Sequence, residues 1–220
     1  MANIIFRAFA VTAFVALAAS AAVAGPTSEL KVAGVIKPPA CTPLLAAGGE
    51  ANYGVIPATS LTTGVNKTLE TKQIGFSIQC ETGVKMAVRA TDNRASSIVS
   101  GITFNQTATK TDAYNYGLGS VAGKNVGGYS LSFDAASTVD GVAVKNIFSP
   151  DGGKSWQAGA VDIQHDGQYF SFGDSSNMPV SFKNLNAKIN VKPVLNKPEN
   201  LPLYGDVPLS GSTTLELLYL

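Results

Sequence analysis

The sequence is poor in the residues that build metal sites, nucleic-acid surfaces and long helices. Its 220 residues include one histidine and two cysteines, Cys41 and Cys80, and two cysteines so far apart make a poor zinc site. The 16 basic residues nearly balance the 15 acidic ones and form no basic cluster, so nucleic acid is not indicated as a partner. No stretch repeats its apolar residues at a helical period over a useful length. These shortages point away from helical, metal-binding and nucleic-acid-binding proteins.

Catalytic motifs are also missing. The sole histidine, His165, lies in a stretch that predicts a solvated turn, and no G-x-S-x-G elbow is present for a serine nucleophile. Residues 117–122 match a degenerate dinucleotide-binding pattern, but the glycines that follow cannot supply the helix that this pattern requires. The loop aspartates lack the spacing of an EF-hand: Asp134, Asp140, Asp151, Asp162 and Asp166. We therefore expect no enzymatic activity, no cofactor and no metal.

Residues 1–24 have the pattern of a secretory signal peptide. Arg7 gives a basic start, residues 8–19 are apolar apart from Thr12, and residues 22–24 form a small-x-small cleavage site. The alternative is a membrane span, but this apolar stretch is short, and no later segment approaches spanning length. We predict export, and a mature chain without a transmembrane span. In an oxidising compartment a Cys41–Cys80 disulfide is expected, with two buried free thiols as the alternative.

The body of the chain is predicted to be all-β. Short apolar alternations are separated by turn residues, as in a β-sandwich, and they place strands at residues 74–80, 85–90, 102–104, 128–133, 142–148, 168–172, 180–182, 187–193 and 212–220. A turn at residues 81–83 indicates that the second strand is a neighbour of the first. Residues 117–128 are predicted to be a loop. Residues 149–156 match an Asp-box, which occurs once and so predicts a structural hairpin rather than a glycosidase propeller.

The segment that follows the leader has a strand pattern without an evident partner. Leu30, Val32, Gly34 and Ile36 alternate and would share one face of an extended strand. Two prolines, Pro38 and Pro39, then separate this strand from the body. An exposed apolar strand at a free terminus is an aggregation hazard unless something receives it. The pattern therefore indicates a strand that is lent to a neighbouring molecule.

In its order of features the chain resembles the subunits of chaperone–usher fimbriae, the surface filaments of Gram-negative bacteria. A signal peptide leads into the alternating extension, Gly34 lies seven residues before Cys41, and the two cysteines have the spacing of the disulfide between the first two pilin strands. The sequence ends in an alternation with a penultimate tyrosine, formed by Thr213, Leu215, Leu217 and Tyr219. The middle segment resembles a less characterised, fimbria-like branch. Val207 departs from the pattern, because the familiar pilins have a glycine at this position.

The resemblance implies a fold, a set of partners and a role for both ends of the chain. The fold would be an incomplete immunoglobulin-like β-sandwich (the pilin fold) over residues 41–220, with residues 25–40 as a free N-terminal donor-strand extension. Leu30, Val32, Gly34 and Ile36 would fill a neighbour's groove, and Thr213, Leu215, Leu217 and Tyr219 would form the edge strand that receives a chaperone or a donor. The implied partners are a periplasmic chaperone, an outer-membrane usher and neighbouring fimbrial subunits. The protein would pass through the periplasm to the cell surface.

Three alternatives stay open at this point. Both termini could be ordinary strands of one closed sandwich, because period-two patterning does not say which sheet receives a strand. The protein could be a carbohydrate- or receptor-binding adhesin module, with Trp156, Tyr114, Tyr116 and Tyr129 as stacking residues. It could also be a secreted hydrolase, although no catalytic constellation supports this reading.

Overall fold

The structure is a computed structural model that describes residues 25–37, 39–159 and 162–220. The predicted leader, with its cleavage site after Ala24, lies outside these residues. The chain divides into two units, residues 1–37 and residues 38–220, which we describe separately. Within the first unit, residues 25–37 form no helix or strand, and their large apolar side chains, among them Leu30, Val32 and Ile36, are exposed. In the described part of the chain, no helix is long and apolar enough to cross a membrane.

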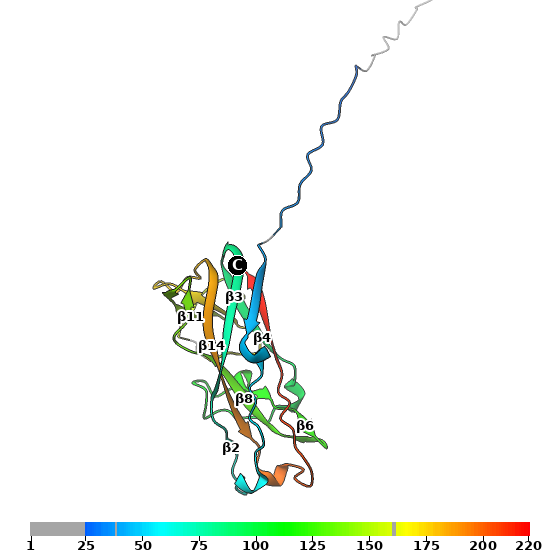
Figure 1. The fold of residues 1–220 in the computed structure, drawn as a ribbon, viewed down its shortest axis with the longest axis vertical. Coiled ribbons are helices and arrows are strands. Elements are labelled where there is room, and N and C mark those ends of the chain that lie inside the picture. The colour runs from blue at the N-terminus through cyan, green and yellow to red at the C-terminus, as the bar shows by residue number, and fades with distance from the viewer. Residues whose placement is uncertain (1–24, 38, 160–161) are drawn as a thin grey trace, which may run out of the picture. The chain divides into compact units, whose positions relative to one another are not determined.

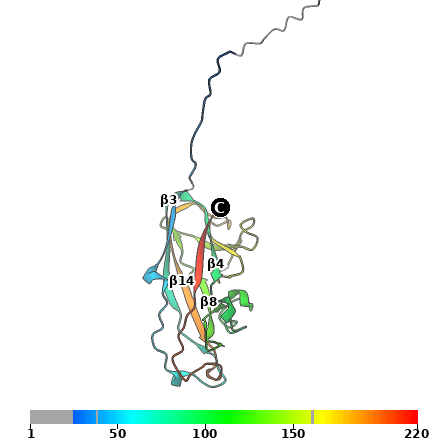
Figure 2. The same cartoon turned by 90° about the vertical axis from the view of Figure 1, so that its right-hand side faces the viewer.

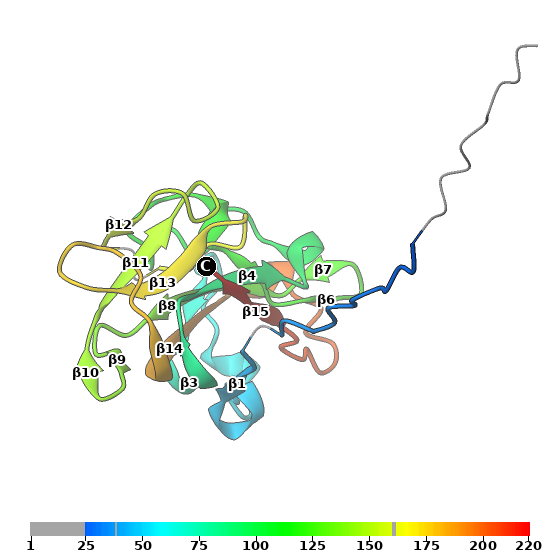
Figure 3. The ribbon, with the colours of Figure 1, turned by 90° about the horizontal axis from the view of Figure 1, so that it is seen from above.

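The second unit is built from two β-sheets (Figures 1 and 3). The path of the first sheet is β1 (Cys41–Leu45), β3 (Lys72–Val84), β14 (Phe182–Leu195), β8 (Gly127–Phe133) and β5 (Tyr116–Gly117). Three short strands join its periphery, namely β2 (Lys67–Thr68), β9 (Thr138–Val139) and β10 (Val142–Ala143). The second sheet has the order β12 (Gln157–Ala158), β11 (Lys145–Ser149), β13 (Tyr169–Gly173), β4 (Met86–Asp92) and β15 (Thr213–Tyr219).

Short elements complete the unit. A separate hairpin pairs β6 (Ser120–Val121) with β7 (Lys124–Asn125). The helical segments in the described residues are 3-10 turns: η1 (Ala46–Gly49), η2 (Ala58–Ser60), η3 (Ala95–Ser97), η4 (Asp112–Tyr114) and η5 (Pro198–Asn200). The described residues are therefore all-β, as the sequence predicted.

The hydrophobic core lies between the two sheets. Strand β3 contributes Ile74, Phe76 and Ile78 at alternate positions, because successive side chains of a strand point to opposite faces. The ring of Phe133 on β8 lies 5.6 Å from that of Phe172 on β13, so aromatic side chains join the two layers. Each such aromatic pair stabilises a core by about 0.5–1.5 kcal/mol beyond the area that it buries.

The structure corrects several predictions about how the strands are arranged. Residues 81–83 belong to β3 rather than to a turn, and β4 lies in the opposite sheet, between β13 and β15. The predicted strand 102–104 is a run of turns, with the amide of Ile102 donating to the carbonyl of Val99. A short apolar run does not distinguish a strand from a buried turn.

Other predicted segments are divided or joined. The predicted strand 142–148 is split between β10 in the first sheet and β11 in the second. Residues 187–193 lie inside the long strand β14, which also contains Phe182 and has a bulge between Phe182 and Asn184. The predicted loop 117–128 contains the β6–β7 hairpin.

The Asp-box is a structural hairpin, as predicted. It connects β11 to β12, and the Asp151 carboxylate accepts hydrogen bonds from the Ser149 hydroxyl at 2.7 Å and from the amide and hydroxyl of Ser155 at 2.9 and 2.6 Å. These donors lower the pKa of Asp151, with the Ser155 hydroxyl as the largest cause. Because these donors lie in the same hairpin as Asp151, the charged carboxylate stabilises the geometry of the turn.

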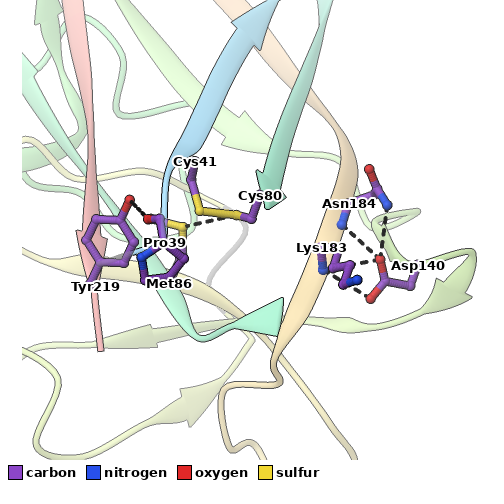
Figure 4. The surroundings of a disulfide bond; sticks show 8 residues. All are labelled: Pro39, Cys41, Cys80, Met86, Asp140, Lys183, Asn184 and Tyr219. Carbon is purple, nitrogen blue, oxygen red and sulfur yellow. Dashed lines mark hydrogen bonds between the residues drawn. A yellow bond between two sulfur atoms is a disulfide. The ribbon is translucent and has the colours of Figure 1, made fainter. Parts of the chain in front are cut away.

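The two cysteines form the predicted disulfide (Figure 4). Cys41 on β1 is directly opposite Cys80 on β3 in the antiparallel ladder. The bond therefore holds the short strand β1 at the edge of the first sheet.

We expect the Cys41→Ser, Cys80→Ser double variant to lose about 2–5 kcal/mol of unfolding free energy, the usual cost of removing a native disulfide. Urea unfolding followed by tryptophan fluorescence measures this difference. A reducing agent should destabilise the unmodified protein and leave the double variant unchanged. Equal stability of the two proteins would contradict a structural role for the bond.

Candidate functional site

The last strand, β15, is an edge strand with one neighbour. Each of its residues from Thr213 to Tyr219 pairs with β4, and no other described strand pairs with it. Figure 2 shows this strand, coloured red, facing the viewer beside β4. An edge of this kind presents backbone donors and acceptors that another strand can pair with.

The hydrogen bonds at the two ends of β15 identify which backbone groups are available. The Asn93 amide donates to the Ser212 carbonyl at 3.0 Å, and the Leu220 amide donates to the Lys85 carbonyl at 3.1 Å, so both terminal bonds point toward β4. Paired residues of an antiparallel ladder alternate between hydrogen-bonded and non-hydrogen-bonded positions. The backbone groups directed at the open side therefore belong to Thr213, Leu215, Leu217 and Tyr219, which are the four residues predicted for the receiving strand.

The side chains of β15 follow the predicted alternation. Thr213, Leu215 and Leu217 are half-buried, and both leucines pack against the core, while Thr214 and Glu216 are exposed. On the outer face, Glu216 accepts a hydrogen bond from Arg89 Nε at 3.1 Å. Tyr219 is 49% exposed, although it shares the face of Leu217.

A large groove lies beside β15. Its volume is about 1020 Å³, and its floor is formed by inward-facing side chains of β8 and β14, namely Tyr129, Leu131, Ile189, Val191, Pro193 and Leu195. One wall is the start of β15 with the preceding segment 201–212, and the other is segment 48–61. The cavity is therefore an apolar trough between the two sheet edges formed by β1 and β15, with core side chains at its base.

The wall opposite β15 is not part of a sheet. Strand β1 ends at Leu45, which is paired with Phe76, and segment 48–61 continues with no strand of its own. The Tyr53 hydroxyl holds this wall in place by donating to the Val191 carbonyl on β14 at 3.1 Å. The Lys72 ammonium lies 5.2 Å from the centre of the Tyr53 ring, which adds a cation–π contact.

The wall that leads into β15 depends on a close approach at Gly211. A Cβ atom at this position would lie 2.6 Å from Cε1 of Tyr129, so a side chain is excluded there. The Tyr129 hydroxyl lies 2.7 Å from the Thr213 hydroxyl, within hydrogen-bonding distance. Val207, at the position where the familiar pilins have a glycine, is half-buried against the core and lines the groove. In this chain the close approach is made at Gly211 instead.

The groove lining stops at Leu45 on β1 and at Leu215 on β15, and the chain ends beyond these residues are tied to each other. The Tyr219 hydroxyl donates to the Pro39 carbonyl at 2.7 Å and so ties the last strand to the residues just before β1 (Figure 4). Apart from the phenols of Tyr53 and Tyr129, two ionisable side chains line the groove, Asp206 and Glu50. Both are acidic.

The four aromatic residues considered as a stacking platform do not form one. Tyr114, Tyr116 and Tyr129 are buried, and Trp156 is half-buried. The Tyr116 and Tyr129 rings stack with centres 5.2 Å apart inside the body. His165 lies in a bend, as predicted, but its side chain is half-buried rather than solvated, with its Nε2 atom 3.0 Å from the Asp112 carbonyl oxygen. In the described residues, no group of three or more His, Cys, Asp or Glu side chains is arranged to hold a metal ion.

Sequence reasoning missed the wall and the floor of the groove. Tyr53 and segment 48–61 carry no strand pattern, so nothing in the sequence linked them to the C-terminal strand. The floor residues Val191 and Leu195 were expected only as members of a strand or its flank. The one signal for these residues was the apolar alternation of β14. This alternation does not show whether another strand covers the face that carries them.

We expect alkaline pH to weaken the groove wall through Tyr53. Burial raises the pKa of Tyr53 to about 12, from about 10 in an unfolded chain. A raised pKa in the folded state means that this stabilisation is complete below about pH 10 and is lost as the pH rises through about 12. Urea unfolding at increasing pH should show the unfolding free energy falling in this window.

The unfolding free energy of the Tyr53→Phe variant should fall less steeply with rising pH. At neutral pH it should already be lower by about 0.5–1.5 kcal/mol, the usual net contribution of one hydrogen bond. Part of the slope should remain, because burial also raises the pKa values of Tyr116 and Tyr129. Tyr204→Phe is the matched control, since this tyrosine is exposed. If the unfolding free energy of Tyr53→Phe fell with pH as steeply as that of the unmodified protein, the contribution assigned to Tyr53 would be contradicted.

Comparison with known proteins gives one family and one relative. A sequence profile of the family described as "Protein of unknown function (DUF1120)" matches residues 30–147, which is more than half of the chain. A curated relative, "Uncharacterized protein YhcF" of Escherichia coli (strain K12), is 32% identical over 90 residues, which cover 41% of this chain and 37% of the relative. The match thus spans little more than a third of that relative's length. The matched family segment includes the alternating extension from Leu30 and both cysteines.

Proposed function

The chain belongs to the family described as "Protein of unknown function (DUF1120)", and from this premise we propose that it is a structural, non-enzymatic subunit of a bacterial surface fimbria, assembled by donor-strand exchange. The observation that carries the proposal is the apolar groove of about 1020 Å³ beside the unpaired edge of β15. The site consists of the open edge of β15 and the groove beside it. A strand-binding site requires these two parts, namely backbone groups at an edge and apolar pockets beside it.

The groove gives a physical reason for assembly. Half-buried Leu215 and Leu217 and the floor of β14 leave apolar surface open to water, and apolar burial contributes about 25 cal/mol per Å². An incoming strand would cover this surface and pair with the backbone of β15 in the same step. A subunit without such a strand is expected to be unstable and prone to association.

The N-terminal extension has the chemistry of the missing strand. Leu30, Val32 and Ile36 are large, apolar and exposed, and they alternate with residues that would face solvent. The stretch Leu30–Ile36 has the same number of residues as β15, so the two would run alongside each other for their full length. Gly34 would lie where the groove leaves no room for a side chain.

In this proposal the second unit is an incomplete immunoglobulin-like sandwich of the pilin type. The two strands that flank the groove, β1 and β15, are the edges of different sheets, and one additional strand between them would cover the core. A periplasmic chaperone would occupy the groove first, and an outer-membrane usher would direct its replacement by a neighbouring subunit's extension. The protein would travel through the periplasm to the cell surface, as the predicted leader implies.

The other two functions receive less support. An adhesin module needs exposed aromatic platforms, and Tyr114, Tyr116 and Tyr129 are buried. A hydrolase needs a nucleophile with a base in reach, and His165 instead contacts backbone carbonyl oxygen. A closed sandwich containing both termini would need a strand in the extension, and residues 25–37 form none.

We expect deletion of residues 28–36 to give a chain that still binds a chaperone but cannot act as a donor. A synthetic peptide of residues 25–37 should bind the groove of the deletion variant and stabilise it, by about 2.7 kcal/mol when the peptide is present at about 100 times its dissociation constant. Thermal unfolding and fibre incorporation measure the two effects. Normal incorporation of the deletion variant as a donor would overturn the proposal.

A matched pair of peptides tests which face of the extension enters the groove. Val32→Asp places a carboxylate on the inward face and should weaken binding at least about 100-fold, because burying an unpaired charge is costly. Ala33→Asp places the same charge on the outward face and should leave binding nearly unchanged. Equal effects of the two substitutions would contradict strand insertion with this alternation.

A further inference from the structure

The end of the second unit opposite Tyr219 carries exposed apolar side chains on two loops that are fixed to each other. These loops contain η2 and η5 and lie together at the far end of the body from the C-terminus (Figures 1 and 2). The Gly64 amide donates to both carboxylate oxygens of Glu199, at 3.0 and 3.2 Å. The Lys67 ammonium donates to the Ser60 carbonyl at 3.1 Å, which closes the first loop. The loops therefore present a defined surface.

Three residues of these loops form what we call the tip patch: Val65, Leu203 and Tyr204. Their exposed fractions are 55%, 40% and 87%. The patch is continuous with the groove, because Leu203 also lines the groove, together with Leu61 and Leu201. Exposed apolar surface that extends an apolar groove is typical of an interaction site.

The Tyr219 end of the groove fixes the direction in which a neighbour's strand enters. The chain that follows a donor strand must leave the groove through an open end, and the hydrogen bond from Tyr219 to Pro39 joins the start of β1 to the end of β15, beyond the last groove-lining residues of these strands, Leu45 and Leu215. The donor's last residue, Lys37, therefore leaves at the tip patch. Because β15 runs from the tip patch toward Tyr219, this direction makes the donor strand antiparallel to β15.

The connection between the donor strand and its own body is short. Four residues, 37–40, separate Ile36 from Cys41, and they span at most about 14 Å when fully extended. Pro38 and Pro39 stiffen this connection. The neighbour's body must therefore lie directly against the tip patch, with the end that carries its half-exposed Tyr219 and Leu220 facing it.

Charge supports the same arrangement. Asp206 lines the groove at the end of the tip patch, and Lys37 is the residue that would pass it as the donor leaves. Opposite charges at this point favour this direction of the strand, since reversal would replace Lys37 at Asp206 with Glu29 and Lys31, whose charges cancel.

We propose that the tip patch is a body-to-body interface that receives the next copy of this chain, with Lys37 of the incoming copy beside Asp206. This inference rests on the proposed function and adds a second contact to strand exchange. The groove would recognise the extension, and the tip patch would recognise the body behind it. Successive copies would then have a fixed orientation rather than hang from a flexible strand.

The test compares two ligands of one acceptor. The acceptor is the full chain with Val32→Asp and Ile36→Asp, which cannot act as a donor, and the ligands are the peptide of residues 25–37 and the unmodified full chain. Adding Leu203→Ser and Tyr204→Ser to the acceptor should leave peptide affinity within about 2-fold and lower the affinity for the full chain at least about 10-fold, a free-energy difference that one small apolar interface can supply. Val142→Ser, at an exposed apolar residue on β10, is the matched control and should change neither affinity.

The outcomes separate the two proposals. If the peptide does not bind the acceptor, the proposed function fails. If the peptide binds and the tip-patch variant still takes up the full chain with unchanged affinity, the interface is refuted while the proposed function stands. Peptide binding by the variant also shows that the variant is folded.

Disulfide trapping tests the direction of the strand. A peptide with Lys37→Cys should cross-link under mild oxidation to an acceptor with Asp206→Cys and not to one with Leu220→Cys. The opposite pattern would overturn the proposal, because it would place the donor's body at the Tyr219 end of the groove.

Discussion

The structure depends on one constraint, which is that β15 has a partner on one side only. Its ladder with β4 uses the backbone groups of alternate residues and directs those of Thr213, Leu215, Leu217 and Tyr219 at an open groove. The same four residues turn their side chains toward the interior side of the sheet. Backbone pairing and apolar burial are therefore incomplete at the same place, so any strand that supplies one also supplies the other.

Three tyrosine hydroxyls fix the positions of the segments around this incomplete site. Tyr53 fixes the wall without a strand to β14, Tyr129 lies against Thr213 where β15 begins, and Tyr219 joins the end of β15 to Pro39. A tyrosine suits this task because its ring packs with apolar neighbours while its hydroxyl finds a backbone or side-chain partner. The walls are thus positioned without a strand between them.

The division of the chain between two sheets explains where the groove lies. Strand β3 leads directly into β4 in the opposite sheet, so the edges formed by β1 and β15 belong to different layers. The disulfide joins β1 to β3 at Cys41, and the ladder between the two strands continues only to Leu45, after which the chain leaves the sheet. An apolar floor from β8 and β14 is left between the two edges. Such a floor is a core surface without its cover, and in the proposed fimbria that cover comes from the next molecule.

Much of the strand content could be predicted from the sequence. Strands β3, β4, β8, β13 and β15 were expected because their apolar residues alternate, and this period is a local property of an extended chain. The all-β class, the disulfide and the Asp-box hairpin were expected for similarly local reasons. The neighbour relation between β3 and β4 was wrong, and residues 102–104 were wrongly taken as a strand, because sheet membership and burial depend on residues far away in the chain.

The sequence by itself determined which side chains of the last strand share a face. It also predicted the Cys41–Cys80 disulfide, which the structure contains. Only the tertiary structure decided that β15 is an edge, that segment 48–61 forms the facing wall and that Gly211 makes the close approach to Tyr129. The physical reason is that a period of two fixes the faces of a strand but carries no information about its neighbours, which are chosen by packing across the whole body.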